Sequence, residues 1–142
     1  MKILELKTVE ELLTGYPLLT HLYPNLTCLE YEQQLKEMLP HNYSMLAAYD
    51  KDELIGLSGV WIGHKLWCGK YMELDNVIVA EDFRSRGVGA MLFDYAKKLA
   101  KKKSCSSIGL DAFTYNHAGH KFFFKEDFVV KGYHFVHVLN QD

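Results

Sequence analysis

The chain has 142 residues, of which 49% are hydrophobic and 24% charged, and its formal net charge is −2. This length suits one domain with its own core, and the composition is ordinary for a globular protein. The small net charge gives no general attraction to nucleic acid, and no apolar run is long enough to cross a bilayer. We therefore expect a single domain over residues 1–142 that binds neither nucleic acid nor membrane.

The cysteines and histidines do not form a recognisable metal or redox motif. Cys28, Cys68 and Cys105 are widely spaced and form no Cys-x-x-Cys pair, and none of the seven histidines belongs to a His-Glu-x-x-His motif. We therefore predict no metal site. The amino terminus carries Glu5 and lacks the apolar core of a signal peptide. These features indicate reduced thiols and a cytoplasmic protein.

The first half of the chain predicts an initial strand, two main helices and a pair of strands. The predicted strands, short apolar runs between turn residues, are residues 3–6, 44–49 and 54–62. Two helices are expected to begin at capping-box pairs, Thr8 with Glu11 and Thr27 with Glu30. The second helix should end before Pro40, and a further helical turn is expected over residues 18–23.

The second half alternates strands with helices. The predicted strands are residues 73–79, 107–113 and 128–139, and the predicted helices are residues 88–99 and 118–126. Three consecutive strands joined by short turns should be antiparallel, whereas a strand-helix-strand unit requires parallel strands and a right-handed crossover. The pattern predicts a mixed α/β (α+β) fold, in which a mixed sheet of six to seven strands has helices on both faces.

A short basic turn with two glycines joins the fourth predicted strand to the long helix. A helix that begins there offers free backbone N–H groups and a positive dipole end, which favour a phosphate. Gly87 and Gly89 remove side chains where a ligand would approach, and Arg84 and Arg86 add positive charge. A Rossmann fingerprint does not fit because Leu92 stands where a third Gly or Ala is needed, and no Walker A sequence is present. A basic helix start without a ligand is the alternative.

The spacing Arg84-x-x-Gly87-x-Gly89, after a strand and at the head of an amphipathic helix, resembles the acetyl-coenzyme A (acetyl-CoA) motif of the GNAT N-acetyltransferase superfamily. Residues 116–128 are similar to the family's Asn…Ala-x-x-Phe-Tyr-x-Lys-x-Gly-Phe block. This block departs from the family at three positions, where Gly119 replaces Ala, Phe123 replaces Tyr and Asp127 replaces Gly. The resemblance implies a GNAT-like fold.

The resemblance also implies acetyl-CoA as a co-substrate, with its pantetheine arm in the gap between two splayed parallel strands. The N–H of Val77 would point at the thioester oxygen, as a fixed donor in a water-poor cleft. Asn116 matches a family position that contacts the coenzyme arm, and Phe123 would pack beside that arm. The implied coenzyme-binding residues are Val77, Ile78, Val79, Arg84, Ser85, Arg86, Gly87, Val88, Gly89, Ala90, Asn116 and Phe123.

Acetyl transfer to an amine also needs a proton acceptor, because an amine is mostly protonated at neutral pH. Glu73 occupies the strand position that carries a catalytic carboxylate in some family members, and Asp75 is the substitute base. Strand alternation predicts that Glu73, Asp75, Val77 and Val79 share one face. A solvated carboxylate at the strand edge is the alternative for Glu73. Phe123 lacks the Tyr hydroxyl that protonates the leaving thiolate in many members.

We therefore expect an acetyl-CoA-dependent N-acetyltransferase whose acceptor is a primary amine of a small molecule or peptide, attacking directly in a ternary complex. A catalytically silent acyl-CoA-binding module is the alternative, and an α/β domain with a plain anion site is a third. The aromatic and acidic residues available to shape an acceptor site are Tyr16, His21, Tyr23, Glu30, Tyr31 and Trp61. Because the chain is one strand short of the family pattern, an unpaired edge near residues 128–139 favours a homodimer.

Overall fold

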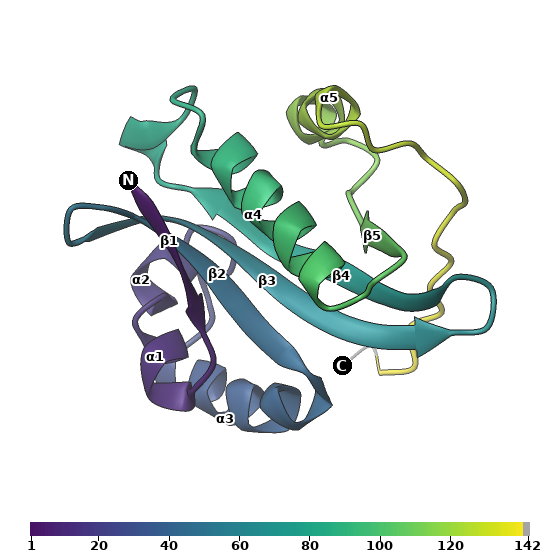
Figure 1. Ribbon diagram of the computed structural model, residues 1–142. Helices are drawn as coiled ribbons and strands as arrows, with labels where there is room; N and C mark the ends of the chain where they lie inside the picture. The colour runs from purple at the N-terminus through teal and green to yellow at the C-terminus, as the bar shows by residue number, and fades with distance from the viewer. Residues whose placement is uncertain (141–142) are drawn as a thin grey trace. The chain divides into compact units, whose positions relative to one another are not determined.

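The computed structural model describes residues 1–140, which form two compact units, Met1–Leu110 and a second unit that begins at Asp111 (Figure 1). The first unit contains β1 (Lys2–Leu6), α1 (Val9–Leu13), α2 (Tyr16–Leu19), α3 (Cys28–Met38), η1 (Leu39–His41), β2 (Tyr43–Asp50), β3 (Glu53–Lys65), β4 (Gly69–Val79), η2 (Glu81–Phe83), α4 (Val88–Lys102) and β5 (Ser107–Leu110). The second unit contains α5 (His117–Lys125).

The strands of the first unit form one five-stranded sheet in the order β1-β2-β3-β4-β5. Neighbouring strands are antiparallel as far as β4, and β4 and β5 are parallel, as the sequence predicted. The prediction of six to seven strands was wrong for the described residues. β5 ends at Leu110 instead of continuing to Phe113, and residues 128–139 form no strand. Strand formation depends on a hydrogen-bonded neighbour more than on intrinsic preference, and residues 128–140 have no ladder partner.

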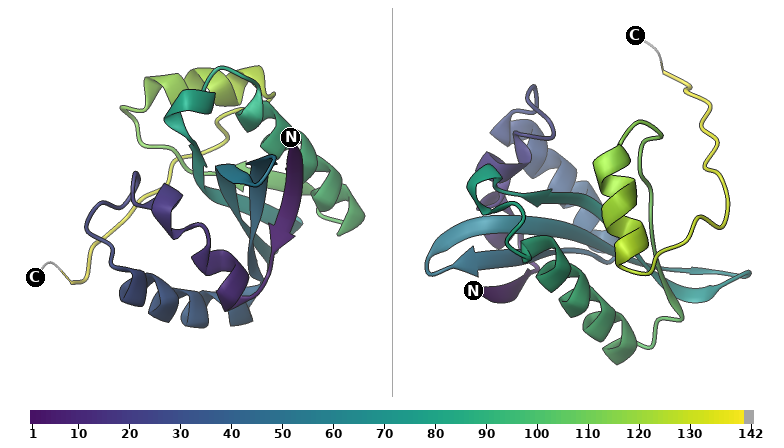
Figure 2. Two further views of the ribbon diagram at one scale, coloured as in Figure 1. Left: turned by 90° about the vertical axis from the view of Figure 1, so that its left-hand side faces the viewer. Right: turned by 90° about the horizontal axis from the view of Figure 1, so that it is seen from above.

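Helices cover both faces of this sheet, and neighbouring residues of β3 show which helix covers which face. Gly56 faces α4, because a Cβ at this position would lie 2.9 Å from Cγ1 of Val88. Leu57 faces the opposite way and packs in the core cluster with buried residues of α1, α2 and α3, among them Leu12, Leu19 and Leu35. Figure 2 shows α4 on one side of the sheet and the three N-terminal helices on the other.

The helix starts follow the capping signals of the sequence. Thr8 is the N-cap of α1, and its side chain accepts a hydrogen bond from the Glu11 N–H. Thr27 and Glu30 form a complete capping box at α3, with each side chain accepting from the other residue's backbone N–H. Such caps satisfy N–H groups that no helical carbonyl reaches, and so they fix where each helix begins.

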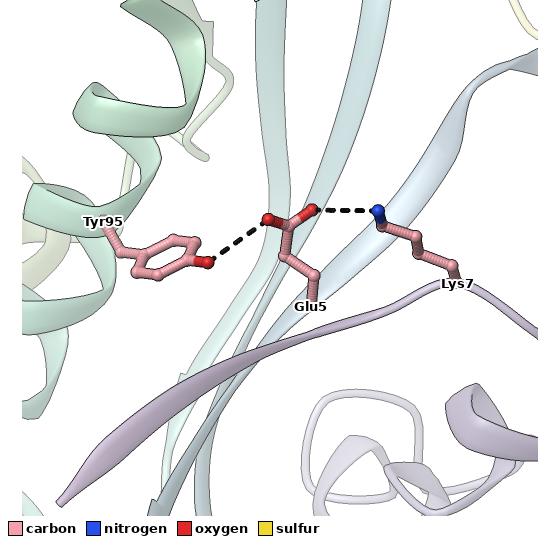
Figure 3. A network of polar contacts seen from close by, with 3 residues as sticks. All are labelled: Glu5, Lys7 and Tyr95. Atoms are coloured by element: carbon pink, nitrogen blue, oxygen red, sulfur yellow. Dashed lines mark hydrogen bonds and ion pairs between the residues drawn. The ribbon is translucent and has the colours of Figure 1, made fainter. Parts of the chain in front are cut away.

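A polar contact ties the edge strand β1 to α4 (Figure 3). The Tyr95 hydroxyl donates to Glu5 Oε1 at 3.2 Å, and Lys7 Nζ lies 3.7 Å from Glu5 Oε2. Burial, followed by the neighbouring Glu5 carboxylate, raises the pKa of Tyr95. The contact joins residues that are far apart in sequence, and it holds the middle of α4 against the first strand.

Two further observations concern residues 1–140 as a whole. All three cysteines are free thiols. Within this range no helix combines the length and the apolar character needed to span a membrane.

Candidate active site

The central feature of the site is a β-bulge in the second half of β4. Asp75 pairs with Gly59 of β3, and Ile78 pairs with Leu57, so that Asn76 and Val77 together oppose the single residue Ser58. Asn76 has a φ of +49°, in the left-handed region that Asn tolerates better than most residues. One extra residue on one strand in this conformation is the defining property of a bulge.

The bulge overturns the prediction that Glu73, Asp75, Val77 and Val79 share one face. Glu73 and Asp75 do share a face, because they pair with Trp61 and Gly59 of β3, which stand two residues apart. Beyond the extra residue the alternation is reversed. Ile78 then packs in the core cluster beneath α1–α3, and Val79 pairs with Gly56, which faces α4. The sequence prediction assumed an unbroken period of two, and a bulge shifts that period by one residue.

The same half of β4 has an open edge. β5 pairs with Tyr71 to Leu74 only, and no other strand of the described residues pairs with β4 beyond Leu74 on that side. The Ala80 N–H donates to Ile55 O of β3 at 2.8 Å, so alternation directs the backbone groups of Val77 and Val79 away from β3, toward the open edge. An extended ligand can therefore pair there as an additional strand does.

The basic turn lies directly after this open edge. Gly87 is the N-cap of α4, has a φ of +82° and is surrounded by open space, because no atom lies within 4 Å of where its Cβ would stand. No side chain caps this helix start, so its first N–H groups stay available to a ligand. The exposed Arg84 donates from Nε to Val79 O at 3.2 Å, and the Arg86 guanidinium lies over the Phe83 ring. The glycine, the uncapped helix start and the arginines predicted for this turn are therefore present.

The two carboxylates differ in their surroundings. Glu73 is half-buried and stands beside Gly109 of β5, its register partner, where a Cβ would lie 2.9 Å from Glu73 Oε2. Asp75 accepts hydrogen bonds from Trp61 Nε1 at 2.8 Å and from the Tyr43 hydroxyl at 3.5 Å. Burial raises the pKa of Asp75, and these two hydrogen bonds oppose the rise.

The remaining predicted residues belong to the second unit, which is described by itself. Asn116 is the N-cap of α5, and its Oδ1 accepts from the Gly119 N–H at 3.0 Å. A Cβ at position 119 would overlap the Asn116 side chain in its present orientation. Phe123 packs edge-on against Phe122 and Phe128, and Asp127 adopts a φ of +69°, in the left-handed region that favours glycine.

The structure thus brings the carboxylates, the open edge and the turn together within the first unit. Sequence reasoning missed Asn76, Gly59 and Tyr43. A lone Asn directly before a β-branched run was the available signal for the bulge, because Asn is enriched at left-handed positions. Within residues 1–140, no group of three His, Cys, Asp or Glu side chains is placed to hold a metal ion.

Comparison with known proteins identifies the family of the chain. A family model described as acetyltransferase (GNAT) family matches residues 6–128. The chain belongs to the GNAT acetyltransferase family. A curated relative, an uncharacterized N-acetyltransferase of Bacillus subtilis (strain 168) called YhdJ, is 26% identical over 133 residues, covering 92% of this chain and 94% of the relative.

Solved structures share the fold at low sequence identity. A ribosomal-protein-alanine N-acetyltransferase from Brucella melitensis biovar Abortus 2308 has a TM-score of 0.84 at 19% identity, covering 98% of this chain and 100% of that chain. The aminoglycoside N-acetyltransferase AAC(6')-Iy, in complex with CoA, has a TM-score of 0.81 at 17% identity, covering 96% of this chain and 94% of that chain. These likenesses establish the GNAT fold, and they span nearly the whole chain.

Proposed function

We propose that this GNAT protein is an acetyl-CoA-dependent N-acetyltransferase that acetylates a primary amine. The observation that carries the proposal is the continuity of the open β4 edge with the uncapped start of α4, through a basic turn that contains Gly87. An extended pantetheine arm could pair with the backbone of the open edge, and the pyrophosphate that follows it could bind the N–H groups of the helix start. The complex of AAC(6')-Iy with CoA is consistent with this ligand.

The residues of the first unit have two proposed tasks in coenzyme binding. Val77 and Val79 would pair with the pantetheine arm, while the backbone of Ile78 stays engaged with Leu57 of β3. Residues 84–90 would hold the pyrophosphate through backbone N–H groups and the charge of Arg84 and Arg86. In the second unit, Asn116 and Phe123 remain proposed contacts of the coenzyme arm.

Acetyl-CoA would supply an activated acetyl group as a thioester. The protein's part is to hold an amine that has lost its proton and to stabilise the oxygen that gains charge. Glu73 and Asp75, which share one face of β4, are the proposed proton acceptors, and the Val77 N–H is the proposed oxyanion donor. Direct attack in a ternary complex requires no covalent enzyme intermediate.

Two measurements on the wild-type protein test this function. Acetyl-CoA at a hundred times its Kd should stabilise the fold by about 2.7 kcal/mol, which raises the melting temperature by roughly 5–10 °C in a chain of this size. A panel of primary amines should then release thiol from acetyl-CoA in the presence of the protein. A stabilised protein that acetylates no amine would favour the silent acyl-CoA-binding module, and no stabilisation at millimolar acetyl-CoA would contradict both coenzyme proposals.

A further inference from the structure

The Asp75 carboxylate is held from two neighbouring strands. Trp61 of β3 donates its indole N–H to Oδ2 at 2.8 Å, and Tyr43 of β2 directs its hydroxyl to Oδ1 at 3.5 Å. The two rings also contact each other, with centroids 4.6 Å apart. Each carboxylate oxygen therefore has its own donor, and the donors brace one another, which restricts the orientation of the carboxylate.

Gly59 provides the space for this arrangement. It is the register partner of Asp75 on β3, and a Cβ at this position would overlap Asp75 Oδ1 and crowd the Tyr43 hydroxyl. The Asp75 carboxylate thus lies across the backbone of β3, and any side chain at position 59 would exclude it. This feature distinguishes Asp75 from an ordinary strand carboxylate that reaches into solvent.

The charge of Asp75 lacks a cationic partner. Its two donors are neutral, and no ion pair among residues 1–140 includes it. Burial raises its pKa more than the two hydrogen bonds lower it, so the ionised form is under-stabilised in the protein alone. A bound cation would offset that cost, because a partly buried carboxylate gains most from a close opposite charge.

Aromatic side chains surround the same position. The Tyr23 hydroxyl donates to Asn76 Oδ1 at the bulge, and burial followed by the charge of Asp75 raises the pKa of Tyr23, so this phenol also lies near the carboxylate. With Tyr43 and Trp61, three aromatic residues from three different segments gather at one carboxylate. Aromatic rings attract cations with their faces. Tyr43 is buried, so the more exposed Tyr23 and Trp61 are the rings that suit an organic ammonium ion.

We propose that Asp75 binds the acceptor as a primary ammonium ion and takes its proton, and that Trp61 and Tyr43 are positioning residues that hold Asp75 for this task. The inference rests on the proposed function and deepens it. In this step one N–H bond of the ammonium breaks, its proton passes to a carboxylate oxygen of Asp75, and the electron pair stays on nitrogen for attack on the thioester.

The site also selects the class of acceptor. Asp75 places a negative charge in this region, with no cationic partner among residues 1–140. An acceptor with a carboxylate next to its amine would be repelled there, because like charges at short range are unfavourable. The preferred acceptor is therefore an amine without an adjacent carboxylate, such as an alkylamine or a peptide amine, rather than a free α-amino acid.

The first test uses fluorescence and needs no acetyl-CoA. The chain has two tryptophans, and Trp67 is 75% exposed in the β3–β4 turn, so Trp67→Phe leaves Trp61 as the only indole. In this variant n-butylamine should change the Trp61 fluorescence in a saturable way. Norvaline, the carboxylated analogue of butylamine, and n-butanol should need at least about tenfold higher concentrations to give half of the maximal fluorescence change. Adding Asp75→Asn should abolish the difference between butylamine and butanol. No saturable response to butylamine, or an equal response in the Asp75→Asn variant, would overturn the proposal.

The second test uses acetylation of the best amine of the panel. Asp75→Asn should lower kcat/KM by at least about 100-fold, the lower range for loss of a general base. Trp61→Phe and Tyr43→Phe each keep a ring and remove a donor to the charged form, so the acid limb of the kcat/KM profile should move to higher pH. The matched controls Trp67→Phe and Tyr49→Phe should leave it in place. An acid limb that stays unmoved in both donor variants would contradict the positioning role.

The two tests separate the inference from the function on which it rests. Selective butylamine binding without any acetylation would contradict the proposed function and keep the ammonium site. Acetylation that survives Asp75→Asn within tenfold would keep the function and overturn the ammonium site. Melting temperatures of all variants exclude loss of folding as the cause.

Discussion

Gly87 combines a left-handed backbone with open space, and these two properties can be tested separately. We expect Gly87→Glu to abolish coenzyme A binding, because it adds a carboxylate where the pyrophosphate is proposed to lie. Gly87→Ala adds only the backbone cost of a non-glycine residue at positive φ, about 1–2 kcal/mol of stability, without the charge. Calorimetric titration should therefore show binding in the Ala variant and none in the Glu variant. Unchanged affinity in a folded Glu variant would place the pyrophosphate elsewhere.

Asp75 should reduce stability while it serves function. Because its pKa is raised in the folded protein, the native carboxyl binds its proton more tightly than the unfolded one. The stability of the fold therefore falls as the pH rises from the ordinary aspartate range through the raised pKa, and the loss is complete above it. We expect Asp75→Asn to raise the melting temperature at pH 7 by roughly 2–4 °C, which corresponds to about 1 kcal/mol in a chain of this size.

The same linkage sets the control for that prediction. Below the ordinary aspartate range, where the carboxyl binds its proton in the folded and the unfolded state alike, the wild type and the Asp75→Asn variant should melt at closely similar temperatures. Thermal scans at both pH values measure the difference. A variant that is less stable than wild type at pH 7 would show that the two hydrogen bonds outweigh the burial of the charge.

At the level of elements, the bulge in β4 decides which residues reach the site. Asn76→Val places a β-branched residue at a φ of +49°, which should cost more than the 1–2 kcal/mol typical of a left-handed residue. Asn76→Gly accepts this backbone conformation and loses the side-chain hydrogen bonds of Asn76 to Tyr23 and Tyr43, of which Tyr23→Phe loses the first.

Asn76→Val should therefore be much less stable to urea and much less active in amine acetylation than Asn76→Gly. The stability and activity of Asn76→Gly should be close to those of Tyr23→Phe. If Asn76→Val is as stable and active as Asn76→Gly, β4 can pair with β3 without the bulge. The register beyond Asn76 would then have to slip by one residue, so that Val79 would exchange faces with Ile78.

Most elements of this fold follow from local patterns. The apolar spacing of α4 and the capping box of Thr27 and Glu30 specify helices through contacts only a few residues apart. The bulge depends on how β4 pairs with β3, which no short window of sequence contains. Residues 128–139 carry a strand-like composition, but a strand also needs a partner. The sequence motifs name the residues of the proposed site, but the faces to which the β4 residues belong depend on the bulge and were not predictable.

At the scale of the whole molecule, residues 129–139 lie beyond the family match and expose many apolar side chains. The family model ends at residue 128, and residues 129–140 form no helix or strand. Among residues 129–139 the exposed apolar side chains are Val129, Val130, Tyr133, Phe135, Val136, Val138 and Leu139. Apolar surface gains about 25 cal/mol per Å² when it is removed from water, so this segment favours association.

We propose that the segment pairs with a second copy of the chain, because a homodimer satisfies both its apolar side chains and its backbone groups. Light scattering should give twice the 16.4 kDa mass of one chain. Phe135, which is 91% exposed, should matter at the interface, and Phe135→Lys should shift the mass toward that of the monomer. Phe124→Lys is the matched control, since Phe124 is 58% exposed on α5 outside the segment, and it should leave the dimer intact. A wild-type monomer at high concentration would contradict the dimer, and a dimer that persists in Phe135→Lys would place its interface outside this segment.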